Sequence, residues 1–446
     1  GRAGGGDSGP AAEGEEVKYY RLRHVAQVNP STPAFSCLAD SDELTFLPME
    51  AVWPGKWRQL GLVRKKSEVA SGYTRFQDGD VLVPKITPTF EASRSILVSG
   101  LCNGVGTGTT ELHVVRCGER VDPRYVLYVM HAHHFLELGK SEMHGVAGQQ
   151  RVPDEFIRDF VIWVPDLTEQ RRIADFLDAE TALVDALVQS RVRQLELVSE
   201  RAEAYLSERL FPGILSSPLG KYPWPWLPKI PDNRPLVRLG YVCRIQGGVT
   251  VDSSRKLDGD VVTRPYLRVA NVQADRIDLS SVTEITVPRE VAARSTLRPG
   301  DVLMTEGGDI DKLGRGTVWR GELPDALHQN HVFALRPDPE RLNGDYLAFL
   351  TRSLHGRCYF ESTGVRSTNL ASTSSSKVLS FPIPLPPLEQ QRQAVADIRS
   401  ALDLADQAKS ALQRQLSLLA ERRRSLITAA VTGQIDVTTA RGADLS

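Results

Sequence analysis

Two polar loops, residues 145–151 and 364–370, carry the side chains best suited to hydrogen-bonding a ligand. Glutamine and asparagine amides can pair bidentately with adenine, and arginine with guanine, while glycines let a backbone approach a groove closely. Gln150 falls opposite Asn369 when the loops are aligned on their glycines, and their neighbours differ, so we expect the two loops to offer different hydrogen-bonding groups to a ligand. Ordinary structural turns are the alternative. The candidate contact residues in these loops are Gln149, Gln150, Arg151, Arg366, Ser367, Thr368 and Asn369.

Basic side chains follow two runs in which we expect strands, Asp80–Val83 and Asp301–Met304. Lysine and arginine at such loop positions can hold phosphate groups and so position a protein on a nucleic acid. The basic run at residues 64–66 is of the same kind. Solvated surface is the alternative for each residue. The candidates are Lys85, Arg94, Lys312 and Arg315.

The sequence lacks the motifs of common catalytic and metal sites. It has no Gly-x-x-x-x-Gly-Lys-Ser/Thr phosphate loop, and residues 29–32 lack the second proline and the aromatic residue of the amino-methyltransferase motif. His131, His133 and His134 lie in an expected helix, where neighbours one and two steps apart do not share a face. We find no counterpart for them in the second half of the chain, and expect plain helical surface. We predict neither catalytic residues nor a metal site.

Composition favours a globular protein in a reducing compartment. The chain has 446 residues, is 41% hydrophobic and 24% charged, and has no run of about 20 apolar residues that could span a membrane. Its five cysteines are scattered without a Cys-x-x-Cys pair, which argues against disulfides and favours the cytoplasm. Since the net charge is −1, any DNA-binding charge must be local or shared with partners. Residues 1–16 are expected to be a disordered tail.

The chain contains one unit written twice. Residues 79–82, Gly-Asp-Val-Leu, recur at 300–303, an offset of 221 (300 − 79). The same offset maps Leu167 onto Leu388 and Gln170 onto Gln391. Several matches in one order at nearly one offset indicate a duplication. Each copy has short β-like runs, a helical piece, a polar loop, an apolar run ending in proline, and one long helix.

The two long helices have the spacing of a coiled-coil seam. Steps of four and three residues from Leu177, and again from Ile398, visit mainly apolar positions, and the first walk ends at Tyr205. A helix packed only on its own domain would show a wider apolar stripe, so we expect the helices to pair. The expected seam residues are Leu177, Val184, Val188, Leu195, Val198, Ile398, Leu402, Leu412, Leu416 and Leu419.

These patterns predict an α+β protein with two β-rich domains joined by two long helices in an antiparallel coiled coil, with internal pseudo-twofold symmetry. An antiparallel pair is preferred because the linker could only just span a parallel pair of helices about 60 Å long. The expected bounds are 17–165 for the first domain, 166–211 for its helix, 212–234 for a linker, 235–386 for the second domain, 387–432 for its helix and 433–446 for a tail.

In this order, the duplicated motifs resemble the specificity subunit of type I restriction-modification systems, over about residues 17–437. The resemblance rests on the domain starts at 21–30 and 237–242, the strands at 108–116 and 330–336, the helix entries at 165–171 and 386–392, and the C-terminal segment 426–436. It implies that each domain is a target-recognition domain reading one half of a bipartite double-stranded DNA sequence. It also places residues 104–108 in a recognition loop, where Thr107 and Thr109 could touch backbone or base.

The resemblance further implies which partners carry the chemistry. The helices would set the spacer and dock two modification subunits, which use S-adenosylmethionine to methylate adenine, and ATP- and Mg-dependent restriction subunits could join. This chain would bind no cofactor and catalyse nothing itself. The alternative is a coiled-coil adaptor that holds two protein partners without reading DNA, which would account for the near-neutral charge. Sequence-selective, salt-sensitive DNA binding separates the two readings.

Overall fold

The computed structural model describes residues 18–53, 56–57, 62–146, 148–216, 235–251, 259–273, 276–310, 313–366 and 371–439. The expected tail at 1–16 and most of the expected linker lie outside this set. The chain divides into two compact units. Unit 1 comprises Gly1–Arg191 with Arg414–Ser446, and unit 2 comprises Val192–Gln413. The division cuts both long helices near their middles, so each unit contains half of each helix.

Unit 1 is built on an antiparallel sheet in which β11 (Leu112–Cys117) lies between β2 (Ala26–Val28) and β8 (Asp80–Pro84), with β9 (Ile96–Leu97) at the edge. An outer sheet has the order β6 (Val63–Lys65), β3 (Glu43–Leu47), β10 (Val105–Gly108) and β7 (Thr74–Gln77), with β3 and β10 parallel. The remaining elements are β1 (Tyr19–Arg21) paired with β12 (Val161–Trp163), β4 (Val52–Trp53) paired with β5 (Lys56–Trp57), and the helices α1 (Pro33–Cys37), α2 (Pro123–His131), α3 (His133–Ser141) and α4 (Asp154–Asp159).

Unit 2 repeats the first sheet, with β21 (Val332–Pro337) between β14 (Cys243–Gln246) and β17 (Val302–Thr305), and β19 (Gly316–Val318) at the edge. Its outer part differs from that of unit 1. It consists of β16 (Thr283–Pro288), β15 (Val261–Leu267) and β20 (Leu327–His328), and of a small sheet of β18 (Gly307–Gly308), β23 (Ala371–Ser372) and β22 (Val365–Arg366). The other elements are β13 (Leu236–Arg238) paired with β24 (Pro382–Pro384), and the helices α6 (Arg289–Ser295), α7 (Gly344–Arg352), α8 (Leu354–Thr363) and α9 (Ser375–Leu379).

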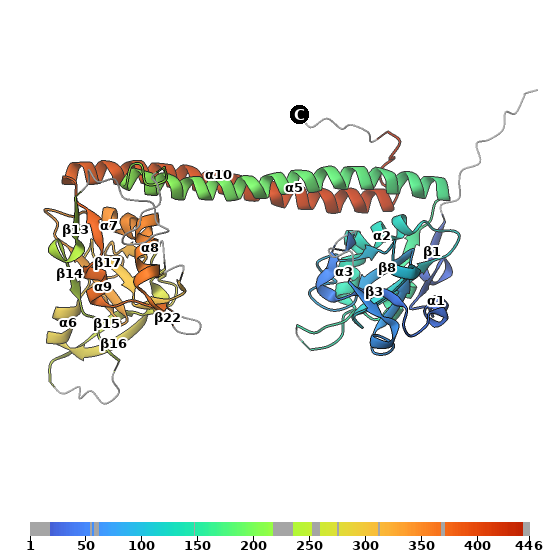
Figure 1. Ribbon diagram of the computed structural model, residues 1–446, viewed down its shortest axis with the longest axis horizontal. Helices are drawn as coiled ribbons and strands as arrows, with labels where there is room; N and C mark the ends of the chain where they lie inside the picture. Colours follow the sequence, from blue (N-terminus) through green and yellow to red (C-terminus); the bar gives the residue numbers. More distant parts are fainter. Residues whose placement is uncertain are drawn as a thin grey trace, which may run out of the picture. The chain divides into compact units, whose positions relative to one another are not determined.

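The long helices are α5 (Leu167–Leu210) and α10 (Leu388–Val431), which lie side by side in Figure 1. In unit 1, Arg423 near the end of α10 forms an ion pair with Asp185 in the first half of α5. In unit 2, Arg209 at the end of α5 forms one with Asp397 near the start of α10, at 2.8 Å. The helices are therefore antiparallel. The α+β fold class with two β-rich regions and paired long helices is confirmed.

The structure places the expected seam residues on the less exposed face of each helix. Leu177, Val184 and Ile398 are buried, and the other seven are half-buried. The walk departs from the buried face at Tyr205, which is 43% exposed, while Leu206 is buried. A straight helix has 3.6 residues per turn, so a strict 3.5-residue pattern drifts off the buried face over several turns.

The cores lie where the sheets and short helices meet the long helices. In unit 1 the core joins α2 and α3 to Leu177 of α5 and to Ile427 and Val431 of α10. In unit 2 it joins α7 and α8 to Leu210 of α5 and to Ile398 of α10. In Figure 1, α2 of unit 1 and α7 and α8 of unit 2 lie next to the long helices, whereas β3 of unit 1 and β15 and β16 of unit 2 lie further away. Each unit therefore packs on the start of its own long helix and on the end of the other.

Candidate nucleic-acid interface

In each unit a buried ion pair joins the two central strands of the sheet, from which the candidate loops extend. Asp80 of β8 accepts hydrogen bonds from Nε and Nη2 of Arg116, both at 2.8 Å, and one from the backbone N–H of Gln77. In unit 2, Asp301 accepts from Nε of Arg336 at 2.8 Å and from its Nη2 at 2.7 Å. Both carboxylates are almost fully buried, so each pair sets the register of the two central strands.

Backbone hydrogen bonds join the loop after β8 to the loop before α4. The N–H of Val152 donates to the carbonyl of Lys85 at 2.8 Å, and the N–H of Thr87 donates to the carbonyl of Gln150 at 3.0 Å. The N–H of Lys85 donates in turn to the carbonyl of Glu111 at 3.0 Å. The structure thus brings Lys85 next to the segment Gln149–Arg151, which lies more than sixty positions later in the sequence.

Arg151 and Glu111 form a bidentate pair at this junction. Nε and Nη2 of Arg151 donate to the two carboxylate oxygens of Glu111, both at 2.8 Å, while the Arg151 side chain stays 46% exposed. The hydrogen bond from Arg151, together with the positive charges of Arg151 and Lys85, holds the pKa of Glu111 below its ordinary value. The pair is therefore ionised at neutral pH. Sequence reasoning missed Glu111, because nothing local marks its contact with residue 151.

Unit 2 repeats this backbone with other side chains. The N–H of Glu306 donates to the carbonyl of His331 at 2.9 Å, and the N–H of Thr373 donates to the carbonyl of Glu306 at 2.8 Å. Nδ1 of His331 lies 2.6 Å from a carboxylate oxygen of Glu306. Where unit 1 has a lysine and a glutamate, unit 2 therefore has a glutamate and a histidine.

Strand pairing also corrects the expected alignment of the two loops. Arg151 bridges Ile86 and His144 in unit 1, and Ser372 pairs with Gly307 and Val365 in unit 2. All three matches keep the 221-residue offset, so Gln150 corresponds to Ala371. The expected match of Gln150 with Asn369 is wrong by two positions, because aligning the loops on their glycines ignored the strand register.

The other candidate residues are scattered. Thr109 is half-buried, and its Oγ1 accepts from the N–H of Glu111 at 3.2 Å. Arg94 and Arg315 are half-buried, while Arg366 is exposed and lies 3.4 Å from Glu361. The candidates that lie outside the described residues are Lys312, Ser367, Thr368 and Asn369.

The expectation for Thr107 is wrong. Residues 105–108 form the buried strand β10 and not a loop, and the Thr107 side chain is 0% exposed. Its neighbour Gly106 packs so tightly on the ring of Phe76 that a Cβ atom would lie 2.2 Å from it. The glycines here serve close packing between strands, so Thr107 cannot reach a ligand.

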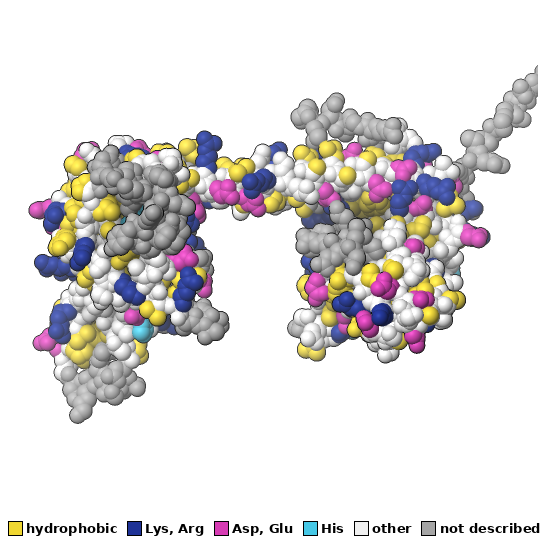
Figure 2. Space-filling model, in the orientation of Figure 1, with side chains coloured by type: hydrophobic (Ala, Val, Ile, Leu, Met, Phe, Trp, Pro, Cys, Tyr) yellow, Lys and Arg dark blue, Asp and Glu magenta, His cyan; other side chains and the backbone are white. Residues whose placement is uncertain are grey.

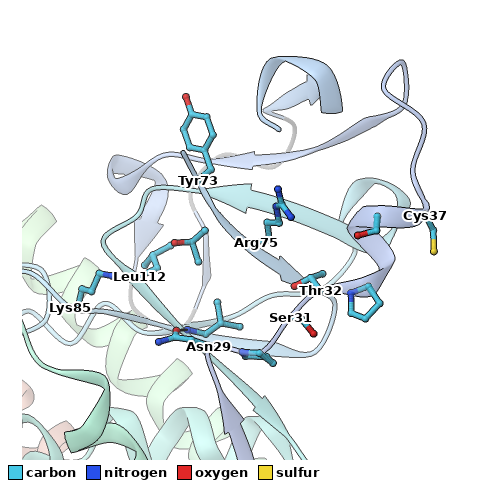
Figure 3. A pocket seen from close by; sticks show the side chains of 13 residues that line it. Asn29, Ser31, Thr32, Cys37, Tyr73, Arg75, Lys85 and Leu112 are labelled. Atoms are coloured by element: carbon cyan, nitrogen blue, oxygen red, sulfur yellow. Dashed lines mark hydrogen bonds between the residues drawn. The ribbon is translucent and has the colours of Figure 1, made fainter. Parts of the chain in front are cut away.

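An open hollow of about 720 Å³ lies in unit 1, and Lys85 is one of the residues that line it. Figure 3 shows Arg75 of β7 above the loop that carries Asn29, Ser31 and Thr32. The Arg75 guanidinium lies 4.0 Å from the centre of the Phe35 ring and donates to the carbonyl of Ala70 at 2.6 Å. Sequence reasoning missed this hollow, although the run Tyr73-Thr74-Arg75 joins an aromatic and a basic residue.

The histidines are not plain helical surface throughout. His131 is buried, and its Nδ1 lies 2.6 Å from Oγ of Ser93 in a hydrogen bond. Burial lowers the pKa of His131 to about 4. His134 also has a counterpart, His355, because each ring stacks on a phenylalanine at 5.4 Å, Phe160 in unit 1 and Phe381 in unit 2. The expected surface position therefore holds for His133, which is exposed, but is wrong for His131, and the expected lack of a counterpart is wrong for His134.

The described residues offer neither a metal-ligand cluster nor a membrane-spanning helix. They contain no group of three or more His, Cys, Asp or Glu side chains that could hold a metal ion. Within the same residues, no helix is both long and apolar enough to cross a bilayer.

Comparison with known proteins gives consistent matches. No protein-family model matches the chain. It is 36% identical over 205 residues to the type I restriction enzyme EcoEI specificity subunit of Escherichia coli, which is 45% of this chain and 34% of that protein. The match thus spans about a third of the relative's length.

Solved structures match nearly the whole chain. A chain from a study of the assembly and conformational transition of the type I R-M system matches with a TM-score of 0.72 and 20% identity, covering 96% of this chain and all of that one. The HsdS subunit from Thermoanaerobacter tengcongensis matches with a TM-score of 0.54 and 20% identity, covering 96% of this chain and 99% of that one. These likenesses show a shared fold. The curated relative adds that part of this chain is similar in sequence to a type I restriction enzyme specificity subunit.

Proposed function

We propose that this chain reads DNA for a type I restriction-modification complex, with each unit reading one half of a bipartite target. One observation carries the proposal. Both units hold two loops together with the same backbone hydrogen bonds, yet present different polar side chains from them. A common scaffold with exchanged polar groups suits two readers of different base sequences, because base-edge hydrogen bonds carry sequence information.

The antiparallel helices suit a spacer in this proposal. Each unit packs on one end of α5 and one end of α10 through its hydrophobic core. Two readers held at a fixed spacing multiply their selectivity, because both half-sites must be present at the right separation. The helices would therefore set the length of the unspecified spacer.

Exposed leucines suit the docking of two modification subunits. Leu183 is 48% exposed and Leu418 63% exposed in unit 1, and their equivalents in unit 2, Leu404 and Leu197, are 63% and 45% exposed. Figure 2 shows hydrophobic side chains along the outer edge of the helices. Because the same pair of exposed leucines occurs in each unit, the chain offers two equivalent apolar positions to two copies of one partner.

The proposed division of labour leaves the chemistry to these partners. Modification subunits would bind S-adenosylmethionine and methylate adenine, and restriction subunits would bind ATP and Mg²⁺. This chain would supply recognition in the cytoplasm and bind no cofactor.

We expect the replacement of Leu404 and Leu418 by glutamate to weaken co-purification of the modification subunit without changing the thermal midpoint of the chain.

A genome-wide map of DNA methylation tests whether this chain directs the complex to a DNA sequence. The chain is co-expressed with its modification subunit, and N6-methyladenine is mapped across the genome. We expect methylation at one bipartite motif that disappears when this chain is omitted.

Replacing residues 235–386 with the corresponding domain of another specificity subunit should change one half-site and keep the other. An unchanged motif after the swap would contradict the domain assignment, and methylation independent of this chain would favour the adaptor.

A further inference from the structure

The contacts of Arg151 leave one edge of its guanidinium available. The group has five N–H donors in a fixed plane. Nε and Nη2 each donate one to Glu111, and Nη1 donates one to the carbonyl of Gln149 at 3.4 Å. Within the described part of the chain, the structure records no partner for the remaining N–H on Nη1 and the remaining N–H on Nη2. These two donors form the end-on fork of the side chain.

We propose that Arg151, oriented by Glu111, reads a guanine in the half-site of unit 1. Guanine presents two acceptors, N7 and O6, side by side in the major groove, and an arginine fork matches them. The inference rests on the proposed function and assigns one base position of the target to one side chain. Glu111 is a positioning residue, since it holds the fork and does not itself touch the base.

The position of Glu111 explains why the fork is held in place. Glu111 lies immediately before β11, its N–H donates to Oγ1 of Thr109 at 3.2 Å, and its carbonyl accepts from the N–H of Lys85. Its side chain is only 23% exposed, while that of Arg151 is 46% exposed. A side chain held in its binding geometry loses less conformational entropy on binding. Lys85 adds positive charge beside the fork, which favours the approach of a phosphate backbone.

Unit 2 lacks this arrangement at the equivalent positions. Ser372 stands where unit 1 has Arg151, and His331 stands where it has Glu111. A serine has no guanidinium fork, so unit 2 cannot read guanine in the same way at this position. The proposal therefore predicts an effect on one half-site only, which provides an internal control.

The experiment measures binding of the full chain, in complex with its modification subunits, to duplexes carrying the methylated motif. In each duplex of a series, one guanine of the unit 1 half-site is replaced by 7-deazaguanine, which lacks the N7 acceptor but keeps its base pairing. The chains compared are wild type, Arg151→Ala, Glu111→Gln and a matched control, Arg158→Ala. Arg158 is similarly exposed, at 43%, and is paired with Asp154 at 2.9 Å, but it lies in helix α4.

We expect wild type and Arg158→Ala to lose roughly tenfold in affinity for one of the 7-deazaguanine duplexes. Arg151→Ala should bind that duplex and the unmodified duplex equally, and Glu111→Gln should fall between. Circular dichroism checks that each variant is folded. If Arg151→Ala keeps the wild-type response, or weakens binding to every duplex alike, the inference is wrong. If wild type binds a duplex without the motif as tightly as the duplex that carries it, the proposed function itself fails.

Discussion

The two units agree where they meet the long helices and differ in their outer parts. Gln170 of α5 donates to the carbonyls of Arg120 and Pro165, and Gln391 of α10 donates to those of Arg341 and Pro386. The outer part of unit 1 is a four-stranded sheet, whereas unit 2 has two smaller sheets and α6 there. Contact with the helices therefore constrains one side of each unit and leaves the other free to differ.

This difference separates a scaffold from the surface it presents. The scaffold consists of the buried ion pair, the buried glutamine and the contacts with both helices. These recur at an offset of 221, except that the arginine of the ion pair recurs at 220 (336 − 116). The loops attached to it keep their backbone hydrogen bonds but exchange their side chains. The comparison therefore predicts that equivalent scaffold substitutions have similar effects in both units.

The largest effect is expected from removing the buried carboxylates. Asp80→Ala in unit 1 and Asp301→Ala in unit 2 each leave a partly buried arginine and a backbone N–H without their acceptor. Breaking one partner of a buried pair costs about 3–5 kcal/mol in the free energy of unfolding. Urea denaturation measures the loss, and hydrogen exchange assigns it to one unit.

Asp260→Ala is the matched control for these variants. Asp260 also forms a bidentate pair, with Arg289, but both side chains are largely exposed. Exposed pairs contribute little, so we expect almost no change in unfolding. If Asp80→Ala and Asp301→Ala differ strongly from each other, the two scaffolds are not equivalent.

The second effect comes from the buried glutamines. The Gln170 and Gln391 side chains are 0% exposed, and each also accepts a backbone N–H, from Asp122 and Asn343 respectively. Gln170→Leu and Gln391→Leu should each cost about 2–3 kcal/mol, because they leave buried backbone groups unpaired. Urea denaturation measures the loss. Equal losses would support the comparison, and a loss in only one unit would contradict it.

The buried scaffold was more predictable from sequence than the contacts of the candidate residues. Gly79-Asp80 and Gly300-Asp301 recur because the glycines adopt positive φ, at 86° and 95°, and the aspartates hold the buried arginines. Repetition exposes such constraints directly. By contrast, the pairing of Arg151 with Glu111 depends on a strand register that brings distant residues together, and the burial of Thr107 and His131 depends on tertiary packing. Sequence periodicity carries none of that information.

The third effect is a loss of stability in acid. Burial lowers the pKa of His131 in unit 1 and of His355 in unit 2 to about 4, against 6.5 for an ordinary histidine. The unfolded chain therefore takes up a proton first as the pH falls, so stability is complete above about 6.5 and declines toward 4. At pH 5 each histidine should cost about 2 kcal/mol relative to pH 7.

His131→Gln sharpens the comparison between the units in acid. The variant should reduce the difference in unfolding free energy between pH 7 and pH 5 for unit 1 and leave it unchanged for unit 2. Part of the dependence in unit 1 should remain, because burial also lowers the pKa of His113 and His134. Urea denaturation with hydrogen exchange at both pH values measures this. A unit 2 that loses its acid sensitivity in His131→Gln would contradict the assignment.

The smallest effect tests the contact of a short helix with the C-terminal part of a long helix, α10 in unit 1 and α5 in unit 2. The N–H of His133 donates to Oγ1 of Thr428, and the N–H of Leu354 donates to Oγ of Ser207, both at 2.9 Å. Removing either hydroxyl should cost about 0.5–1.5 kcal/mol. The two costs should differ, since the first bond is open to solvent while Ser207 is only 2% exposed.

Water can replace the hydroxyl for His133 but not readily for Leu354, so Ser207→Ala should lie near the upper end of that range and Thr428→Ala near the lower end. Ser199→Ala is the control, because its Oγ donates within its own helix to the carbonyl of Leu195. Urea denaturation of the three variants gives the order. A larger loss for Thr428→Ala would mean that unit 1 depends on its second helix more than unit 2 does. Equivalent contacts between a short helix and a long helix would then contribute unequally to the stability of the two units. An alignment of the two halves of the sequence at a constant offset could not reveal that difference.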